Sequence, residues 1–244
     1  MCFLTRQMTV TSPHNERLKL VRKLRDRKHR EREGLFVAEG EDLLEAGLHA
    51  GLEPELVLSA AGSGFGGVEV ERNALDSASE LGSGTRVISV WPQRWSEPAG
   101  PVCVYLHGVG DPGNVGAVIR TAHALVEGSV VLGPNSADPY SPKAVRASMG
   151  SIFAQRVARA SLDETPAPRA ALVAHGGAEP EGIPVPVTVC LGGEREGLSD
   201  DVLATADRHW TIPLRPGGAE SLNVAAAAAI VLRRISSARP EGAS

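Results

Sequence analysis

Five consecutive apolar residues at positions 102–106 constrain the fold of this chain more than any other feature. A short run that is apolar throughout is typical of a strand buried on both faces of a sheet. Further strands are expected at 129–132, 170–174 and 186–191, and helices at 114–126, 142–149 and 221–235. This alternation predicts an α/β fold with a mostly parallel sheet covered by helices on both faces.

A second, smaller α/β domain is expected upstream. The pattern predicts helices at 15–30 and 41–50, strands at 35–38 and 55–59, and a glycine-rich loop at 62–67. Residues 91–101 contain three prolines and are interpreted as a connector. We therefore expect a first domain over 12–92, a linker over 93–100 and a second domain over 101–236.

The charge is unevenly distributed along the chain. The net charge is −4, yet residues 6–32 contain ten basic and three acidic residues, which gives +7 there and leaves −11 for the remainder. Such a local excess favours a phosphate-binding surface, and a solvated helix without a partner is the alternative. The candidate RNA-binding residues are Arg17, Arg22, Lys23, Arg27, Lys28 and Arg30.

Several classes of protein are disfavoured by what the sequence lacks. No apolar run approaches the roughly 18 residues that a membrane-spanning helix needs, and residues 1–10 lack a signal-peptide core. Cys2, Cys103 and Cys190 have neither disulfide nor zinc spacing. We expect a cytoplasmic protein with no metal and no membrane partner.

Residues 108–113 read G-V-G-D-P-G, which matches the G-x-G-x-x-G pattern of dinucleotide-binding turns. That chemistry requires an acidic residue at the end of the next strand to hold the ribose hydroxyls. Here the strand at 130–132 is followed by Gly133, Pro134 and Asn135. A nucleotide-dependent oxidoreductase is therefore disfavoured, although it remains an alternative.

Three polar segments of the second half are candidates for chemistry. The first contains Asn114 and Arg120 at the start of a helix, and the second places Gly192, Gly193 and Glu194 directly after a strand. Glycines there let a flat ligand approach the backbone at the edge where α/β sheets bind ligands. Each segment alone also fits a surface arginine or an ordinary turn.

The third segment is a proline- and glycine-rich loop that leads into the last helix. Glu220, Ser221 and Asn223 would lie in or before its first turn, where they could simply cap the helix. The apolar residues Ile212, Leu214 and Leu222 suit the walls of an adenine pocket instead.

Taken together, the three segments resemble the motifs of the SpoU/TrmH family of RNA ribose 2′-O-methyltransferases, in the SPOUT superfamily. The matching residues are Asn114, Gly116 and Arg120; Leu191, Gly192, Gly193, Glu194, Gly197 and Leu198; and Ile212, Pro213, Ser221, Leu222, Asn223 and Val224. Residues 143–150 are similar to a stretch between the first two motifs. Residues 36–40, with the basic helix before them, resemble the L30e-like substrate-binding domain of ribosomal RNA methylases.

The resemblance implies a trefoil-knotted, homodimeric catalytic domain that uses S-adenosylmethionine. The implied donor site comprises Leu191, Gly192, Gly193, Ile212, Leu214, Ser221 and Leu222. Arg120 would be the catalytic arginine, with Asn114, Glu194, Ser221 and Asn223 ordering the site around it. The family's second motif often carries an asparagine where this chain has Gly193, so any role at that position reduces to backbone.

The reaction so implied is methyl transfer to a ribose 2′-hydroxyl of structured RNA, with 23S ribosomal RNA as the expected substrate. Arginine is a poor base at its ordinary pKa, so Arg120 is expected to stabilise the developing alkoxide and contact phosphate. A transfer RNA substrate and a non-catalytic RNA-binding module on the same fold are the alternatives.

Overall fold

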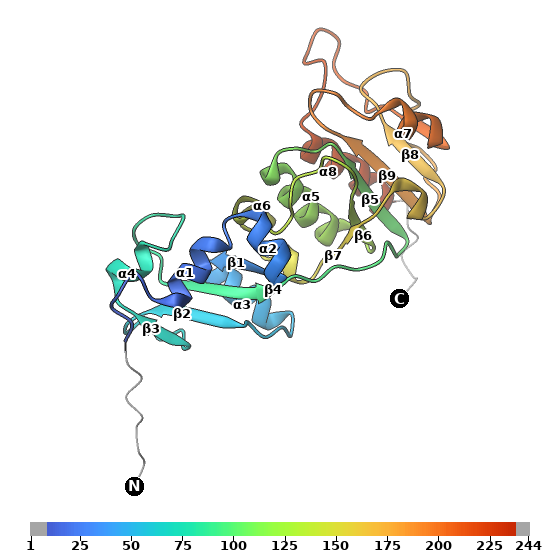
Figure 1. The fold of residues 1–244 in the computed structure, drawn as a ribbon. Coiled ribbons are helices and arrows are strands. Elements are labelled where there is room, and N and C mark those ends of the chain that lie inside the picture. The colour runs from blue at the N-terminus through green and yellow to red at the C-terminus, as the bar shows by residue number, and fades with distance from the viewer. Residues whose placement is uncertain (1–8, 238–244) are drawn as a thin grey trace. The chain divides into compact units, whose positions relative to one another are not determined.

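The computed structural model describes residues 9–237, so Cys2 and Arg6 lie outside the described residues. The chain divides into two compact units, Met1–Gln93 with Tyr140–Phe153, and Arg94–Pro139 with Ala154–Ser244 (Figure 1). The structure thus differs from the expected contiguous domains, because a segment from inside the second domain belongs to the first unit.

The first unit is built on a four-stranded sheet with the order β1-β4-β2-β3, in which only β2 and β3 are parallel neighbours. Its elements are α1 (Glu16–Lys23), α2 (Arg27–Glu33), β1 (Leu35–Glu39), α3 (Glu41–His49), β2 (Leu56–Ala60), β3 (Val68–Val70), α4 (Arg72–Asp76), β4 (Val87–Pro92), α6 (Pro142–Ser148) and the 3-10 turn η1 (Ser151–Phe153). Trp91 and Pro92, expected in a connector, are part of β4, and the Trp91 side chain is fully buried.

The prediction of one basic helix over 15–30 is wrong, since α1 ends at Lys23 and α2 begins at Arg27. Asp26 starts the second helix by accepting a hydrogen bond from the Lys28 backbone nitrogen at 2.9 Å. Arg30 is only 3% exposed, and its Nη1 donates to the carbonyls of Leu24 and Arg25 at 2.8 and 2.6 Å. Its assignment to RNA binding is therefore corrected: Arg30 holds the turn between the helices.

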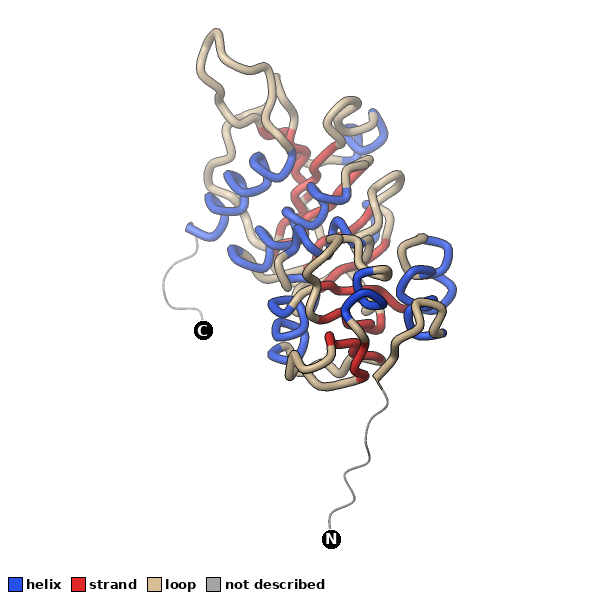
Figure 2. Tube along the Cα trace, turned by 90° about the vertical axis from the view of Figure 1, so that its left-hand side faces the viewer, coloured by secondary structure: helices blue, strands red, loops and turns tan. Residues whose placement is uncertain are grey.

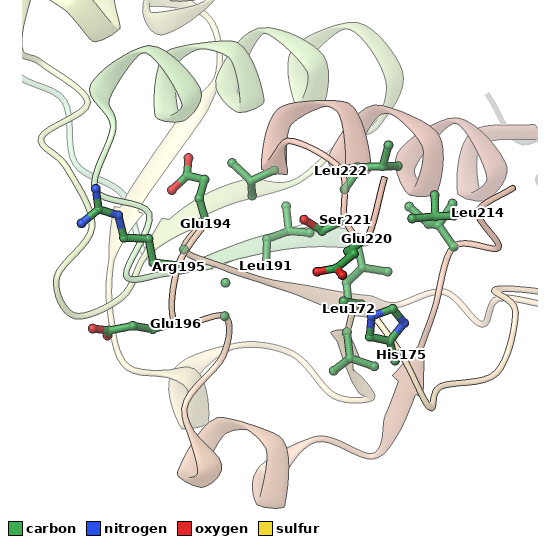
Figure 3. Close-up of a pocket in the computed structure, with 18 residues that line it drawn as sticks. Leu172, His175, Leu191, Glu194, Arg195, Glu196, Leu214, Glu220, Ser221 and Leu222 are labelled. Atoms are coloured by element: carbon green, nitrogen blue, oxygen red, sulfur yellow. The ribbon is translucent and has the colours of Figure 1, made fainter. Parts of the chain in front are cut away.

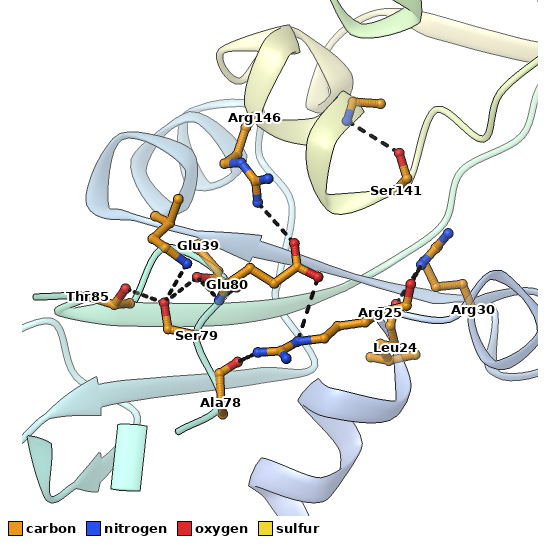
Figure 4. Close-up of polar contacts among 12 residues, drawn as sticks. Leu24, Arg25, Arg30, Glu39, Ala78, Ser79, Glu80, Thr85, Ser141 and Arg146 are labelled. Carbon is orange, nitrogen blue, oxygen red and sulfur yellow. Dashed lines mark hydrogen bonds and ion pairs between the residues drawn. The ribbon is translucent and has the colours of Figure 1, made fainter. Parts of the chain in front are cut away.

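Residues 140–153 complete the packing of the first unit. The ring of Phe36 lies 4.9 Å from that of Tyr140 and 5.7 Å from that of Phe153, measured between centroids. Trp91 and Phe153 lie 4.8 Å apart by the same measure. Arg146 on α6 also contacts Glu80, whose other oxygen faces Arg25 (Figure 4).

The second unit contains a six-stranded sheet with the order β10-β8-β9-β5-β6-β7, and every neighbouring pair is parallel. Its elements are β5 (Val102–His107), α5 (Pro112–Leu125), β6 (Ser129–Leu132), β7 (Arg156–Arg159), η2 (Leu162–Glu164), β8 (Arg169–Leu172), β9 (Val187–Gly192), α7 (Asp200–Thr205), β10 (Arg208–Trp210) and α8 (Val224–Ser237). The predicted mostly parallel α/β architecture is confirmed.

Helices cover both sides of this sheet (Figure 2). Cys103 and Tyr105 point to one face, where they form a core with Leu198 and Val202 beside α7. Because side chains alternate along a strand, Val104 and Leu106 point to the opposite face. Helices α5 and α8 pack against each other, α5 also contacts β6, and α8 contacts β9.

No helix within residues 9–237 is long and apolar enough to cross a membrane.

Candidate active site

A cavity of about 400 Å³ lies in the second unit where β8 and β9 end, beside the start of α8 (Figure 3). Its lining residues are Leu172, Val173, Ala174 and His175 from the end of β8; Leu191, Gly192, Gly193, Glu194, Arg195, Glu196 and Gly197 from the end of β9; and Ile212, Leu214, Glu220, Ser221, Leu222, Val224 and Ala227. The volume falls in the range typical of sites for small molecules and cofactors. All seven residues expected to contact the methyl donor are among them.

Backbone forms one wall of the cavity at the end of β9. A Cβ atom on Gly193 would lie 2.2 Å from the Gly108 carbonyl oxygen, and one on Gly192 would lie 2.2 Å from the Gly197 carbonyl carbon. The turn is closed by hydrogen bonds of 2.9 Å from Gly197 N to Gly193 O and from Gly193 N to His107 O. Neither Gly192 nor Gly193 has space for a side chain, so both present only backbone to a ligand.

A chain of side-chain hydrogen bonds joins the three predicted motifs. Nδ2 of Asn223 donates to Oδ1 of Asn114 at 3.0 Å, and Nδ2 of Asn114 donates to Oε1 of Glu194. Both asparagines are fixed by helix starts. Asn114 N donates to the Asp111 carboxylate at 3.0 Å, and Asn223 Oδ1 accepts from Ala225 N at 2.9 Å. The structure thus brings together Asn114, Glu194 and Asn223, although they come from separate segments.

The remaining two predicted catalytic residues differ in position. Ser221 is exposed and lines the cavity. Arg120 is exposed on α5 and is not among the lining residues. Its guanidinium forms no hydrogen bond or ion pair with another residue of 9–237, so it is available to a substrate.

Sequence reasoning missed the wall that β8 provides. Leu172, Val173, Ala174 and His175 lie in or directly after a strand that was expected at 170–174. Since parallel strands end at the same edge of a sheet, that expectation could have placed these residues beside the ligand. Arg195 and Glu196 were also missed, although they lie within the second motif.

Burial keeps the Cys190 thiol out of the chemistry. Desolvation raises the pKa of Cys190 to about 12, so the thiol stays neutral at physiological pH.

Nowhere in the described part of the chain do three or more His, Cys, Asp or Glu side chains gather so that they could hold a metal ion.

The candidate RNA-binding cations of the first unit differ in their availability. Arg17, Lys23 and Lys28 are exposed, and their charged groups form no hydrogen bond or ion pair with another described residue. Arg22 bonds to Ser77 at 3.3 Å and to the Pro13 carbonyl, and Arg27 pairs with Glu31 at 2.9 Å.

Comparison with known proteins gives consistent matches for both units. The model of the SpoU rRNA Methylase family matches residues 101–233, and that of the MRM3-like substrate binding domain matches residues 15–93. The chain is 31% identical to the 23S rRNA (guanosine(2553)-2'-O)-methyltransferase RlmP of Bacillus subtilis, over 91% of this chain and 97% of that protein. The crystal structure of an AdoMet-bound rRNA methyltransferase from Sinorhizobium meliloti superimposes with a TM-score of 0.82 at 29% identity, covering 93% of this chain and 96% of that one.

Proposed function

This chain belongs to the SpoU rRNA methylase family, and from that premise we propose that it methylates a ribose 2′-hydroxyl of 23S ribosomal RNA with S-adenosylmethionine as donor. The observation that carries the proposal is the hydrogen-bonded chain of Asn223, Asn114 and Glu194 beside the cavity. It joins residues of all three motifs where a ligand can reach them.

The residues of the cavity fit the donor. Leu191, Ile212, Leu214 and Leu222 supply apolar walls for an adenine ring, while Gly192 and Gly193 offer backbone groups at close range. Ser221 adds a hydroxyl to the lining. When bound, S-adenosylmethionine supplies an electrophilic methyl group that needs no metal for its transfer.

The chain's own residues must then orient the acceptor and stabilise its charge. A ribose hydroxyl is a weak acid, so cationic donors aimed at the developing alkoxide lower the barrier. The exposed guanidinium of Arg120, which no described residue engages, suits that role. Asn114, Glu194 and Asn223 hold one another in place and so preorganise the polar end of the site.

The first unit is proposed to bind the RNA. Its match to a substrate-binding domain and its exposed Arg17, Lys23 and Lys28 support this role. Phosphate contacts of this kind supply affinity that does not depend on base sequence. We further propose that the enzyme is a trefoil-knotted homodimer of the cytoplasm, on the resemblance of its three motifs to the family.

The test is methyl transfer from tritiated S-adenosylmethionine to purified RNAs from a strain that lacks the gene. The proposal predicts label in 23S ribosomal RNA, recovered in alkali-resistant dinucleotides because a methylated 2′-oxygen cannot attack its phosphate. Label in transfer RNA would instead identify transfer RNA as the substrate. Donor binding without transfer to any RNA would identify a non-catalytic module.

A further inference from the structure

Arg195 occupies a distinctive place in the cavity wall. It lies in the turn between Gly193 and Gly197, which the 2.9 Å hydrogen bond from Gly197 N to Gly193 O closes. Among the described residues that line the cavity it is the one arginine or lysine. A short, closed turn fixes where its backbone lies, so its guanidinium can reach only the region beside this turn.

The guanidinium of Arg195 is not engaged by a neighbouring carboxylate of the described chain. The side chain is exposed, and within residues 9–237 it has no ion pair or hydrogen bond. Glu194, the preceding residue, is engaged by Asn114 instead. No described residue therefore occupies the five N–H donors of Arg195, which have the planar arrangement that suits phosphate and carboxylate oxygens. Figure 3 shows its guanidinium at the edge of the cavity, directed away from Leu214 and His175.

The cavity has two chemically different ends. Figure 3 shows Glu194 and Arg195 at one end, and Leu214 and His175 at the other. A flat base would fit between the apolar walls, and the reacting end of a donor bound in that way would lie toward Glu194 and its hydrogen-bonded partners. The acceptor hydroxyl must lie in line with the methyl group and hence at that same end.

In RNA, the carbon that bears the 2′-hydroxyl adjoins the carbon that bears the 3′-phosphate. A ribose held at the Glu194 end therefore brings a phosphate with it, next to the turn that carries Arg195. Building on the proposed function, we propose that Arg195 binds the phosphate adjoining the methylated ribose and so positions the acceptor nucleotide. It is a positioning residue for RNA, with no part in holding the donor.

The experiment compares Arg195→Ala and Arg195→Lys with a matched control, Arg208→Ala, an exposed arginine on β10 outside the cavity lining. We expect Arg195→Ala to raise the KM for RNA about 10-fold to 100-fold, as removal of a charge-assisted hydrogen bond does. The slope of log affinity for RNA against log salt should fall by about 0.7 to 0.9, the contribution of one phosphate. Lysine should restore part of the KM, and Arg208→Ala should change neither quantity.

Donor affinity, measured by equilibrium dialysis without RNA, shows whether Arg195 binds the RNA phosphate or the carboxylate of the donor. The proposal predicts a donor Kd within about twofold of wild type, since the donor does not use this residue. A weakened donor with an unchanged KM for RNA would assign Arg195 to the donor's carboxylate and overturn the proposal, as would wild-type behaviour in both assays. If the wild-type protein methylates no RNA, the proposed function fails, while the salt slope of RNA binding still tests Arg195.

Discussion

Asn223 donates a hydrogen bond to Asn114 at 3.0 Å across a sequence separation of 109 residues. Asn114 in turn donates a hydrogen bond to Glu194. Side-chain hydrogen bonds therefore join the starts of α5 and α8 to the turn after β9. The geometry of the polar end of the cavity depends on this arrangement, because each member is oriented by the next.

Replacing Asn223 with aspartate tests the role of these side-chain hydrogen bonds. A carboxylate at this position still accepts from Ala225 N and so keeps the cap of α8, but it cannot donate to Asn114. We expect kcat to fall about tenfold or more with little change in Tm, because charge stabilisation in such sites depends on geometry. Asn223→Ala, which loses the cap as well, should lower both. Full activity in Asn223→Asp would show that the chain of hydrogen bonds is incidental.

Gly193→Ala tests the backbone wall of the cavity. The added Cβ would lie 2.2 Å from the Gly108 carbonyl oxygen, so the turn must move. Overpacking of this kind costs about 1–3 kcal/mol, and we expect donor affinity by calorimetry to fall about tenfold. Gly110→Ala is the control, since no described atom lies within 4 Å of the position that its Cβ would take and its φ is not positive. Equal donor affinity in the two variants would contradict the close approach.

We expect the exposed cations of the first unit to contribute to RNA binding and not to the stability of the fold. Changing Arg17, Lys23 and Lys28 together to alanine should weaken RNA binding and reduce its salt dependence, with a slope change of up to about 0.9 for each phosphate that is no longer neutralised. The urea midpoint should stay near wild type, because none of the three charged groups is buried or bonded to another described residue. Unchanged filter binding across a salt series would leave them as solvated surface residues.

Arg30 should behave in the opposite way, although it lies in the same basic stretch. Its guanidinium is buried and bonded to two carbonyls, so Arg30→Ala leaves them without this donor. Such a change costs about 2–4 kcal/mol, which chemical denaturation would detect. A stable Arg30→Ala variant with weakened RNA binding would instead place Arg30 among the RNA-binding residues.

Stability should depend on Cys190 at alkaline pH. The thiol has a pKa of about 12 in the folded protein, whereas an unfolded chain ionises near 8.5. Between these values the unfolded state binds fewer protons, so stability falls as pH rises. From about pH 7 to about pH 10 the loss from this residue is about 2 kcal/mol. The difference in unfolding free energy between wild type and Cys190→Ala should shrink by that amount, and a constant difference would be inconsistent with the burial.

The parallel sheet was predictable because its central strands are apolar throughout. β7 and β10 could not be found in the same way. Arg156 and Arg159 bound the first, and only Trp210 is buried in the second, because strands at the edges of a sheet have fewer neighbours to cover them. The Glu41–His49 helix was expected almost to the residue. The apolar spacing of α1 ends at Leu24, and the polar residues that follow it have no hydrophobic period that could reveal the break at Asp26.

The candidate site was predictable as a set of residue types and less so as an arrangement. Motif spacing identified Asn114, Glu194 and Asn223, but nothing in it specified that they bond to one another. Burial of Arg30 and the packing of Phe153 against Trp91 depend on contacts between distant parts of the chain. A pattern in the local sequence holds no information about such contacts.

Methylation of 23S ribosomal RNA by this protein is tested most directly by mapping ribose methylation in that RNA. The map is made for a strain that lacks this gene and for its parent. We predict that one 2′-O-methylated position is lost, that wild-type protein restores it, and that Arg120→Ala reduces its restoration about 100-fold or more. An unchanged methylation map would contradict the proposed activity on 23S ribosomal RNA, and full restoration by Arg120→Ala would contradict the proposed role of Arg120.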